Sequence, residues 1–600
     1  MPTRLADNAK RRFQARVFAR QLNPYKATQA ASPWLGFVPD LPVGALPLGA
    51  ASRMENLQVR GGRGGGEFLV NSDGFVQVDT ARLPLGEAAL PSAVGGAVIH
   101  LTEMLRTNSV GARTGEFDLT PIAVTAAVGG VQRLYRISPV TGLWTPIAFS
   151  AGLGTEATGG RDGGADFGSM PQSCFLPSGA AARTAGTGAI AEPCMVYTNN
   201  VDDVYVFPAG TGLHTYEELT NQFGGAFKAL SVASWEGRVF FLNTSESGTR
   251  RHQRIRWTPL FTADPDPAGP GAGAFDIVAL SGEGLRMIPL GPFLACYFSD
   301  GVVFLERSGQ VAAPHRARLI SQYRGLLGPN AVCAIDANVH FGIFRDGWFL
   351  VDASGRFQEV GRAQVGNTDV NKWRETFYNR IDTDNLQRLY CAFDQRLQNV
   401  RISVKPTASS EVSEVWTYDL RSDRVSLDTY EATCWGEFTA QLQTATAWSA
   451  MVDTWDSVAG SWGDYGARFG HRSLVHGRAN GFVYIHDPSF TTYDGANPTW
   501  VYESILTPGT SPRFLKAADR VLLEYVNRSQ PSVTLGVRTD VASEAGTVAT
   551  NQGTEGQVHL VGRHFRTTGQ HLGITVTGAG PVAVRSLELD YQEIPAQERL

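Results

Sequence analysis

The chain has 600 residues, of which 43% are hydrophobic and 18% charged, and its formal net charge is −5. This composition excludes a disordered chain and a protein that coats nucleic acid by bulk positive charge, and the length suffices for one large core or several domains. No stretch approaches the roughly 18 apolar residues of a membrane helix, and the N-terminus lacks a signal-peptide hydrophobic region. We therefore expect synthesis and folding in a cytoplasm.

The first thirty residues are basic. They carry seven Arg or Lys and one Asp, a local charge of +6. This pattern is typical of an arm that docks on an acidic partner or on nucleic acid, and equally of a solvated helix or terminus. Residues 1–50 are predicted to form this arm and an extended Pro/Gly/Leu-rich lead-in. The candidate docking residues are Lys10, Arg11, Arg12, Arg16 and Arg20.

Short β-like segments begin near Met54, and the first expected hairpin pairs 67–70 with 75–79 round a turn at 71–74. A second hairpin form then recurs: strand, short Gly/Asp/Ser/Pro turn, and returning strand. Its copies begin at Leu134, Val204, Val303, Phe349, Val415 and Val483. The spacings of 70, 99, 46, 66 and 68 residues fit a propeller blade of ~40–50 residues with insertions, and the longest gap has room for a further copy.

We therefore predict an all-β fold with a β-propeller of six to eight blades over 51–500, because a propeller buries repeated sheets against one another and leaves few free edges. Two stacked sandwiches remain the alternative. The Gly/Ala-rich stretch 150–193 is expected to be an inserted surface or partner-facing loop. Segments over 501–600 alternate strongly between apolar and polar residues, which predicts a separate C-terminal antiparallel β-sandwich.

One helix is expected, over 367–385. Asp369 is its predicted cap, and Trp373 and Phe377 fall on one face.

No phosphate loop, His-Glu-x-x-His or Gly-x-Ser-x-Gly motif occurs, and we predict no catalytic residue, cofactor site or metal site. Three acidic clusters could be half of a carboxylate pair or a calcium site, but turn and cap chemistry explains them more simply. These clusters are Asp264/Asp266, Asp382/Asp384 and Asp453/Asp456.

Three other residue types are open to a functional interpretation. The cysteines stand singly (Cys174, Cys194, Cys296, Cys333, Cys391 and Cys434) and are expected to be buried free thiols. Cys174 and Cys194 flank a loop and could pair, which a reducing compartment disfavours. The twelve tryptophans could form carbohydrate platforms, but in a β-rich chain core packing is the simpler interpretation. A further group, His559, His564 and His571, is spaced so that the three do not share one strand face.

Several short motifs resemble a group of tailed-phage virion proteins. The motifs are Gly237–Thr244, Arg254–Trp257 with the Pro/Asp loop after it, Gly282–Gly284, Ile288–Leu290, Thr454–Trp462, Gly562–Phe565 and Val584–Tyr591. The group comprises tail hub or nozzle proteins of short-tailed phages, including packaged-DNA stabilisation and tubular tail proteins. The resemblance spans residues 54–591 in scattered pieces. The sequence departs from the group's pattern at 56–60, which runs into a glycine cluster, and at 150–193.

The resemblance implies a structural virion protein that forms a ring, of six copies, below the portal and adaptor. Such a ring would retain packaged DNA and conduct it during ejection. The implied partners are further copies of the chain, the adaptor (head-to-tail connector) or portal, tail fibre, spike or needle proteins, and double-stranded DNA in transit, without a membrane segment. Assembly is expected in the host bacterial cytoplasm. A mildly acidic chain suits a conduit for DNA because it does not bind the DNA phosphates tightly.

Two alternatives remain open. One is a tail-associated propeller that binds or cleaves glycans, for which the tryptophan count is the motivation. The other is a phage or prophage protein of a long tail, near its neck or tip.

Overall fold

The structure is a computed structural model, and nearly all of its regular elements are β-strands, as expected. It describes residues 26–30, 34, 36–40, 50–61, 67–78, 96–107, 117–126, 133–137, 144–149, 171–176, 180–181, 190–191, 194–208, 215–218, 227–263, 269, 271–310, 313–365, 368–409, 412–440, 471–486, 492–508, 514–527, 532–548, 558–580 and 582–594.

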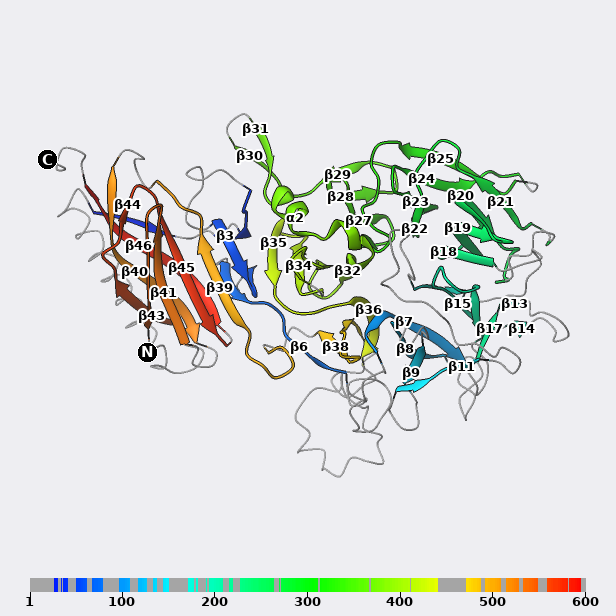
Figure 1. The fold of residues 1–600 in the computed structure, drawn as a ribbon, viewed down its shortest axis with the longest axis horizontal. Coiled ribbons are helices and arrows are strands. Elements are labelled where there is room, and N and C mark those ends of the chain that lie inside the picture. The colour runs from blue at the N-terminus through cyan, green and yellow to red at the C-terminus, as the bar shows by residue number, and fades with distance from the viewer. Residues whose placement is uncertain are drawn as a thin grey trace, which may run out of the picture.

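Seven blades of the described residues stand round a common axis and form a β-propeller (Figure 1). Each blade is an antiparallel meander of four strands. Blade 1 contains β7 (Val98–Thr107), β8 (Phe117–Thr125), β9 (Leu134–Ile137) and β10 (Trp144–Pro146). Blade 2 contains β12 (Gln172–Leu176), β15 (Cys194–Thr198), β16 (Tyr205–Pro208) and β17 (Thr215–Glu218), with β11 (Ala148–Phe149) along its edge. Blade 3 contains β18 (Phe227–Trp235), β19 (Arg238–Glu246), β20 (Thr249–Trp257) and β21 (Gly273–Asp276).

The remaining four blades complete the circle. Blade 4 contains β22 (Gly284–Leu290), β23 (Phe293–Phe298), β24 (Val302–Arg307) and β25 (His315–Ser321). Blade 5 contains β26 (Val332–Ala334), β27 (Val339–Phe344), β28 (Gly347–Asp352) and β29 (Phe357–Glu359). Blade 6 contains β32 (Tyr390–Asp394), β33 (Asn399–Val404), β34 (Glu414–Asp419) and β35 (Arg424–Asp428), and blade 7 contains β36 (Cys434–Ala440), β37 (His471–Gly477), β38 (Val483–His486) and β6 (Phe75–Gln77).

The first strand of each blade lies nearest the axis. These seven strands contact one another in an unbroken circle, from β7 through β12, β18, β22, β26 and β32 to β36 and back to β7. Neighbouring blades pack face to face, so strands such as β23 and β24 are buried on both faces. One shared core, for example, joins Trp235 and Phe240 of blade 3 to Met287 and Leu294 of blade 4. Each blade thus supplies half of two hydrophobic interfaces.

Tight turns specify the meander locally. Glu236 and Gly237 between β18 and β19, and Ser247 and Gly248 between β19 and β20, all have positive φ. That is the type I′ geometry, whose twist matches the twist of paired strands.

Strand β6 closes the ring from the other end of the sequence. It pairs with β38, with Gln77 opposite Tyr484 and Phe75 opposite His486. The Phe75 side chain is fully buried, and its ring lies 4.8 Å from those of both His476 and Tyr493. Opening the propeller therefore requires the removal of a buried aromatic anchor.

Two further sheets form a β-sandwich beside the propeller (Figure 1). One contains β1 (Lys26–Ala30), β4 (Leu57–Gly61), β5 (Glu67–Asn71), β40 (Leu515–Asn527), β43 (Val558–His564), β44 (Thr568–Gly569) and β46 (Val582–Ile594). The other contains β2 (Gly36–Phe37), β3 (Ala50–Glu55), β39 (Thr499–Ser504), β41 (Ser532–Thr539), β42 (Ser543–Val548) and β45 (Leu572–Ala579). Side chains such as Leu523, Leu535 and Ile574 fill the core between them.

A continuous sheet joins the two domains. Strand β3 pairs with β39 of the sandwich and, through Glu55 opposite Leu427, with β35 of blade 6. Directly after β3, buried Asn56 donates to Thr429 Oγ1 at 2.8 Å and to the Thr499 carbonyl at 2.6 Å. Backbone and side-chain hydrogen bonds therefore both cross the domain boundary.

The structure corrects the expected assignment of three N-terminal strands, β4, β5 and β6. Strand β5 pairs with β4 and β46 of the sandwich, whereas β6 belongs to blade 7, so 67–70 and 75–79 do not form a hairpin. Residues 51–61 and 67–71, which the sequence prediction assigns to the propeller, belong to the two sandwich sheets. The physical reason is that both the sandwich edges and the open blade need an additional strand, and the N-terminal segment supplies each in turn.

The stretch 150–193 is also more than an inserted loop, because it contributes β12, the first strand of blade 2. It also holds the short pair β13 (Ala180–Ala181) and β14 (Ile190–Ala191).

The expected helix is shorter than predicted. Strands β30 (Arg362–Val365) and β31 (Thr368–Asn371) form a hairpin, which is followed by α2 (Arg374–Arg380) and the 3₁₀ helix η1 (Thr383–Arg388). Phe377 is buried as expected, but Asp369 lies in β31 and does not cap the helix. Asp40 does so instead, because its Oδ1 accepts the Thr376 amide at 3.0 Å.

Candidate functional site

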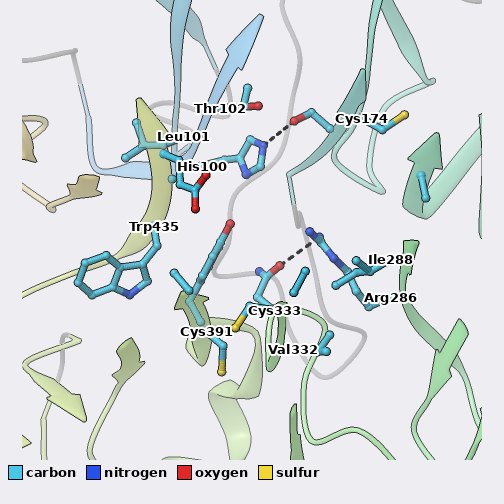
Figure 2. A pocket seen from close by; sticks show the side chains of 18 of the residues that line it. His100, Leu101, Thr102, Cys174, Arg286, Ile288, Val332, Cys333, Cys391 and Trp435 are labelled. Atoms are coloured by element: carbon cyan, nitrogen blue, oxygen red, sulfur yellow. Dashed lines mark hydrogen bonds between the residues drawn. The ribbon is translucent and has the colours of Figure 1, made fainter. Parts of the chain in front are cut away.

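A cavity of about 460 Å³ lies on the propeller axis. The first strands of all seven blades contribute to its lining, together with Asn330 before β26 and Leu474 of β37, and Figure 2 shows side chains from different blades surrounding one space. Each first strand has a hydrogen-bonded neighbour on only one side, so its other backbone edge faces the axis. The volume falls in the range of small-molecule sites, roughly 300–1,000 Å³.

Arg286 brings a guanidinium group into this cavity from β22 (Figure 2). Its Nη1 donates to Asn330 Oδ1 at 3.4 Å, and its Nε is buried without a hydrogen-bond partner among the described residues. Burial lowers the pKa of Arg286, while Tyr390 and Cys174 act to raise it. A half-buried cation without a carboxylate partner is energetically unfavourable, so a ligand or another function must account for Arg286 at this position.

The described lining contains one carboxylate, Glu437 of β36. Its Oε2 accepts from Arg472 Nη1 at 3.3 Å. Burial raises the pKa of Glu437, and the ion pair with Arg472 lowers it. This carboxylate therefore already has a cation of its own, and that cation is not Arg286.

A hydrogen bond between His100 Nε2 and Ser173 Oγ, 3.0 Å long, crosses from β7 to β12 at the cavity wall (Figure 2). It ties blade 1 to blade 2 and places two polar groups beside the cavity.

The thiols of the cavity wall are kept protonated. Burial raises the pKa of Cys174, Cys333 and Cys391 above the ordinary value. All six cysteines are free, so the expected free thiols are present and Cys174 is not bonded to Cys194. Protonated thiols are poor nucleophiles and poor metal ligands.

A second cleft, of about 520 Å³, lies between β4 of the sandwich and blade 6. Its ionisable lining is strongly basic and consists of Arg60, Arg396, Arg421 and Arg424 with the single acid Asp419.

A buried ionic network lies at the junction of the domains. Arg401 of blade 6 is 1% exposed and contacts Asp73 at 3.4 Å. Asp428 accepts hydrogen bonds from Ser72 and from Thr417. Burial raises the pKa of Asp428 to about 6, although Arg401 and both hydroxyls oppose that shift. Because each charge here is satisfied by another part of the chain, we regard the network as structural.

The sequence-predicted docking residues Lys10, Arg11, Arg12, Arg16 and Arg20 lie outside the described residues, as do both Asp264/Asp266 and Asp453/Asp456. The third acidic pair has the turn role that we favoured: Asp382 caps η1 by accepting the Asp384 amide at 3.1 Å and is paired with Lys405. His564 lies 3.5 Å from Asp519 and His571 4.0 Å from Asp540, but no group of three or more potential metal ligands occurs in the described part of the chain.

The described tryptophan side chains pack in the hydrophobic core. All nine tryptophans in the described residues are buried, which leaves none of these nine as an exposed carbohydrate platform. No helix of the described residues is long and apolar enough to span a membrane.

Comparisons with known proteins do not assign this chain to a family. No protein-family model and no curated protein matches the chain. One similar solved structure is an exo-β-1,3-galactanase from Phanerochaete chrysosporium with galactose, at 12% identity over 86% of this chain and 99% of that chain, with a TM-score of 0.25. Another is PorZ, a surface component of the type-IX secretion system of Porphyromonas gingivalis, at 10% identity over 81% of this chain and 61% of that chain, with a TM-score of 0.38. Scores this low carry no argument about function.

Sequence reasoning missed the residues of the axial cavity. Arg286, Asn330, His100 and Ser173 belong to no motif and are far apart in the sequence. The available signal was the arginine itself, because it interrupts the otherwise apolar strand Gly284–Leu290.

Proposed function

We propose that this protein is a structural component of a larger assembly, of the tail hub or nozzle kind that the sequence motifs resemble. The observation that carries the proposal is the continuous sheet from blade 6 through β3 into the sandwich. A component under mechanical load needs domains that do not hinge, and interdomain motion is the default unless the interface is extensive. Here the ring closure by β6, the shared sheet and the Arg401 network all oppose such motion.

The exposed edge of the sandwich offers a surface for assembly. Strand β43 is an edge strand, and its outward Val558 and Leu560 are 50% and 44% exposed. Apolar side chains on a free edge favour pairing with another chain, and a head-to-tail contact that closes by rotation gives a ring. Further copies of this chain are the proposed partners at this edge, and the adaptor or portal is the proposed neighbour of the ring.

The edge can be tested with a charged substitution. We expect the parent protein to assemble into rings, and Val558→Arg to remain monomeric with an unchanged melting temperature, as measured by mass photometry and thermal denaturation. The matched control is Val278→Arg on the propeller, because Val278 is 90% exposed and lies away from the edge. Rings that persist in Val558→Arg would exclude this edge as the assembly surface.

The second candidate function is glycan binding in the axial cavity, favoured by the polar groups of Arg286, Asn330 and Glu437 in its wall. Glycoside hydrolysis generally uses two carboxylates, and the described lining supplies one, so we put forward binding without cleavage. Titration calorimetry with host capsule or lipopolysaccharide oligosaccharides is the test. The candidate predicts heat of binding that Arg286→Met abolishes; no heat with the parent protein removes it.

A further inference from the structure

The axial cavity holds a positive charge that its described acids do not neutralise. Glu437 is paired with Arg472, and Arg286 forms no ion pair with any described residue. An arginine remains protonated in proteins even where burial lowers its pKa. The charge of one guanidinium group is therefore left facing the cavity.

We propose that the axial cavity binds an oxyanion group, a carboxylate or a phosphate, through Arg286. The Nε atom of this side chain is buried and out of reach of the cavity, Nη1 donates one of its two hydrogens to Asn330, and Nη2 donates none to a described residue, so the free donors are at the Nη1–Nη2 end of the guanidinium group. Two parallel donors on a planar fork match two oxygens of a carboxylate or phosphate, and such charge-assisted bonds are about twice as strong as neutral ones.

The remainder of the wall indicates what the anionic group is attached to. The cavity volume of about 460 Å³ exceeds the need of a bare anion, and Ile288, Val332 and Trp435 contribute apolar surface to it. Ser173 and Asn330 add neutral polar groups. The occupant is thus a small organic acid or phosphate ester. This inference does not depend on the scaffold proposal, and if glycan binding also holds, it specifies an acidic sugar.

The test compares anions at constant ionic strength. The full chain is melted in sodium chloride, in sodium acetate and in sodium phosphate, and then in chloride with D-glucuronate or with neutral glucose. We expect a higher melting temperature in acetate, phosphate or glucuronate than in chloride, and no shift with glucose. The larger shift identifies the group as carboxylate or phosphate. Equal melting temperatures in all five conditions overturn the proposal.

Variants localise the effect. Arg286→Met should lose the anion-dependent shift and, in chloride, melt at or above the parent temperature, because the substitution removes a half-buried charge that no described carboxylate compensates. The matched control Arg316→Met, on the outer strand of the same blade and paired with Glu306, should keep the shift. A shift retained in Arg286→Met overturns the proposal.

A variant that preserves the charge gives an independent readout. Arg286→Lys keeps the cation but loses the planar fork, and we expect the dissociation constant for the best of these anions to rise roughly ten- to a hundred-fold, as for the loss of one charge-assisted hydrogen bond. If Arg286→Met fails to fold, Arg286→Lys provides the test, and an unchanged affinity of Arg286→Lys for the anion overturns the proposal.

Discussion

Phe75→Ala should open the propeller at blade 7. The Phe75 side chain is fully buried among Tyr430, His476, Tyr484 and Tyr493, and Phe→Ala at such a site costs about 3–5 kcal/mol. A loss of about 4 kcal/mol in the local stability of blade 7 raises its open population by about a thousandfold. Strand β6 pairs with β38, and the backbone of Phe75 is also hydrogen-bonded to Thr492 and Asp494, which follow β38 in the sequence, so the loss should be confined to blade 7.

Thiol labelling followed by mass spectrometry measures that opening. Cys434 lies in β36 of blade 7, fully buried, and its labelling rate should rise about a thousandfold in Phe75→Ala. Cys296 of blade 4 serves as an internal reference whose rate should change little. The control Phe514→Ala removes a ring that is 36% exposed and should leave both rates unchanged. Local closure by β6 would be refuted if the labelling rates of Cys434 and Cys296 rose equally in Phe75→Ala, or if neither rate rose.

Three further outcomes are expected. Burial lowers the pKa of His340 to about 4, so below about pH 6.5 the unfolded chain binds more protons than the folded chain and the free energy of unfolding decreases as the pH is lowered. Between pH 7 and pH 5, the free energy of unfolding measured by chemical denaturation should therefore fall by about 2 kcal/mol more in the parent than in His340→Gln. Arg401→Met leaves buried Asp73 without this cation and should cost about 3–5 kcal/mol by the same assay, whereas a neutral effect would contradict the ionic account of the junction. Asp40→Ala removes the cap of α2 and should cost about 1 kcal/mol, seen as faster exchange of the Glu375 and Thr376 amides, which Asp40 accepts; unchanged exchange at both would contradict the cap.

The blades could be predicted from the sequence because part of each is local. Four of the six recurring hairpins correspond to the third and fourth strands of a blade, whereas the copies at Val303 and Val483 correspond to the third strand alone, in blades 4 and 7. The 99-residue gap contains the missing copy, β20 and β21 of blade 3. Short turns with Gly, Asp or Ser fix such hairpins without help from the rest of the chain.

What could not be predicted depends on partners far apart in the sequence. The turn at 71–74 has suitable chemistry for a hairpin, but β5 pairs with β46 and β6 pairs with β38 instead of with each other. Asp369 is correctly spaced as a cap, yet Asp40 reaches the helix from the N-terminal segment. The role of Arg286 could not be predicted for the same reason, since only closure of the ring brings it into one cavity with Glu437 and His100. Tertiary pairing overrides local preference in all three cases.

Cryo-electron microscopy of the purified full-length protein tests the central proposal most directly. The account predicts closed rings in which a rigid unit, a seven-bladed propeller continuous with its sandwich, repeats about one axis. Single 64.7 kDa particles at all accessible concentrations, or a sandwich that takes many orientations relative to the propeller, would contradict it.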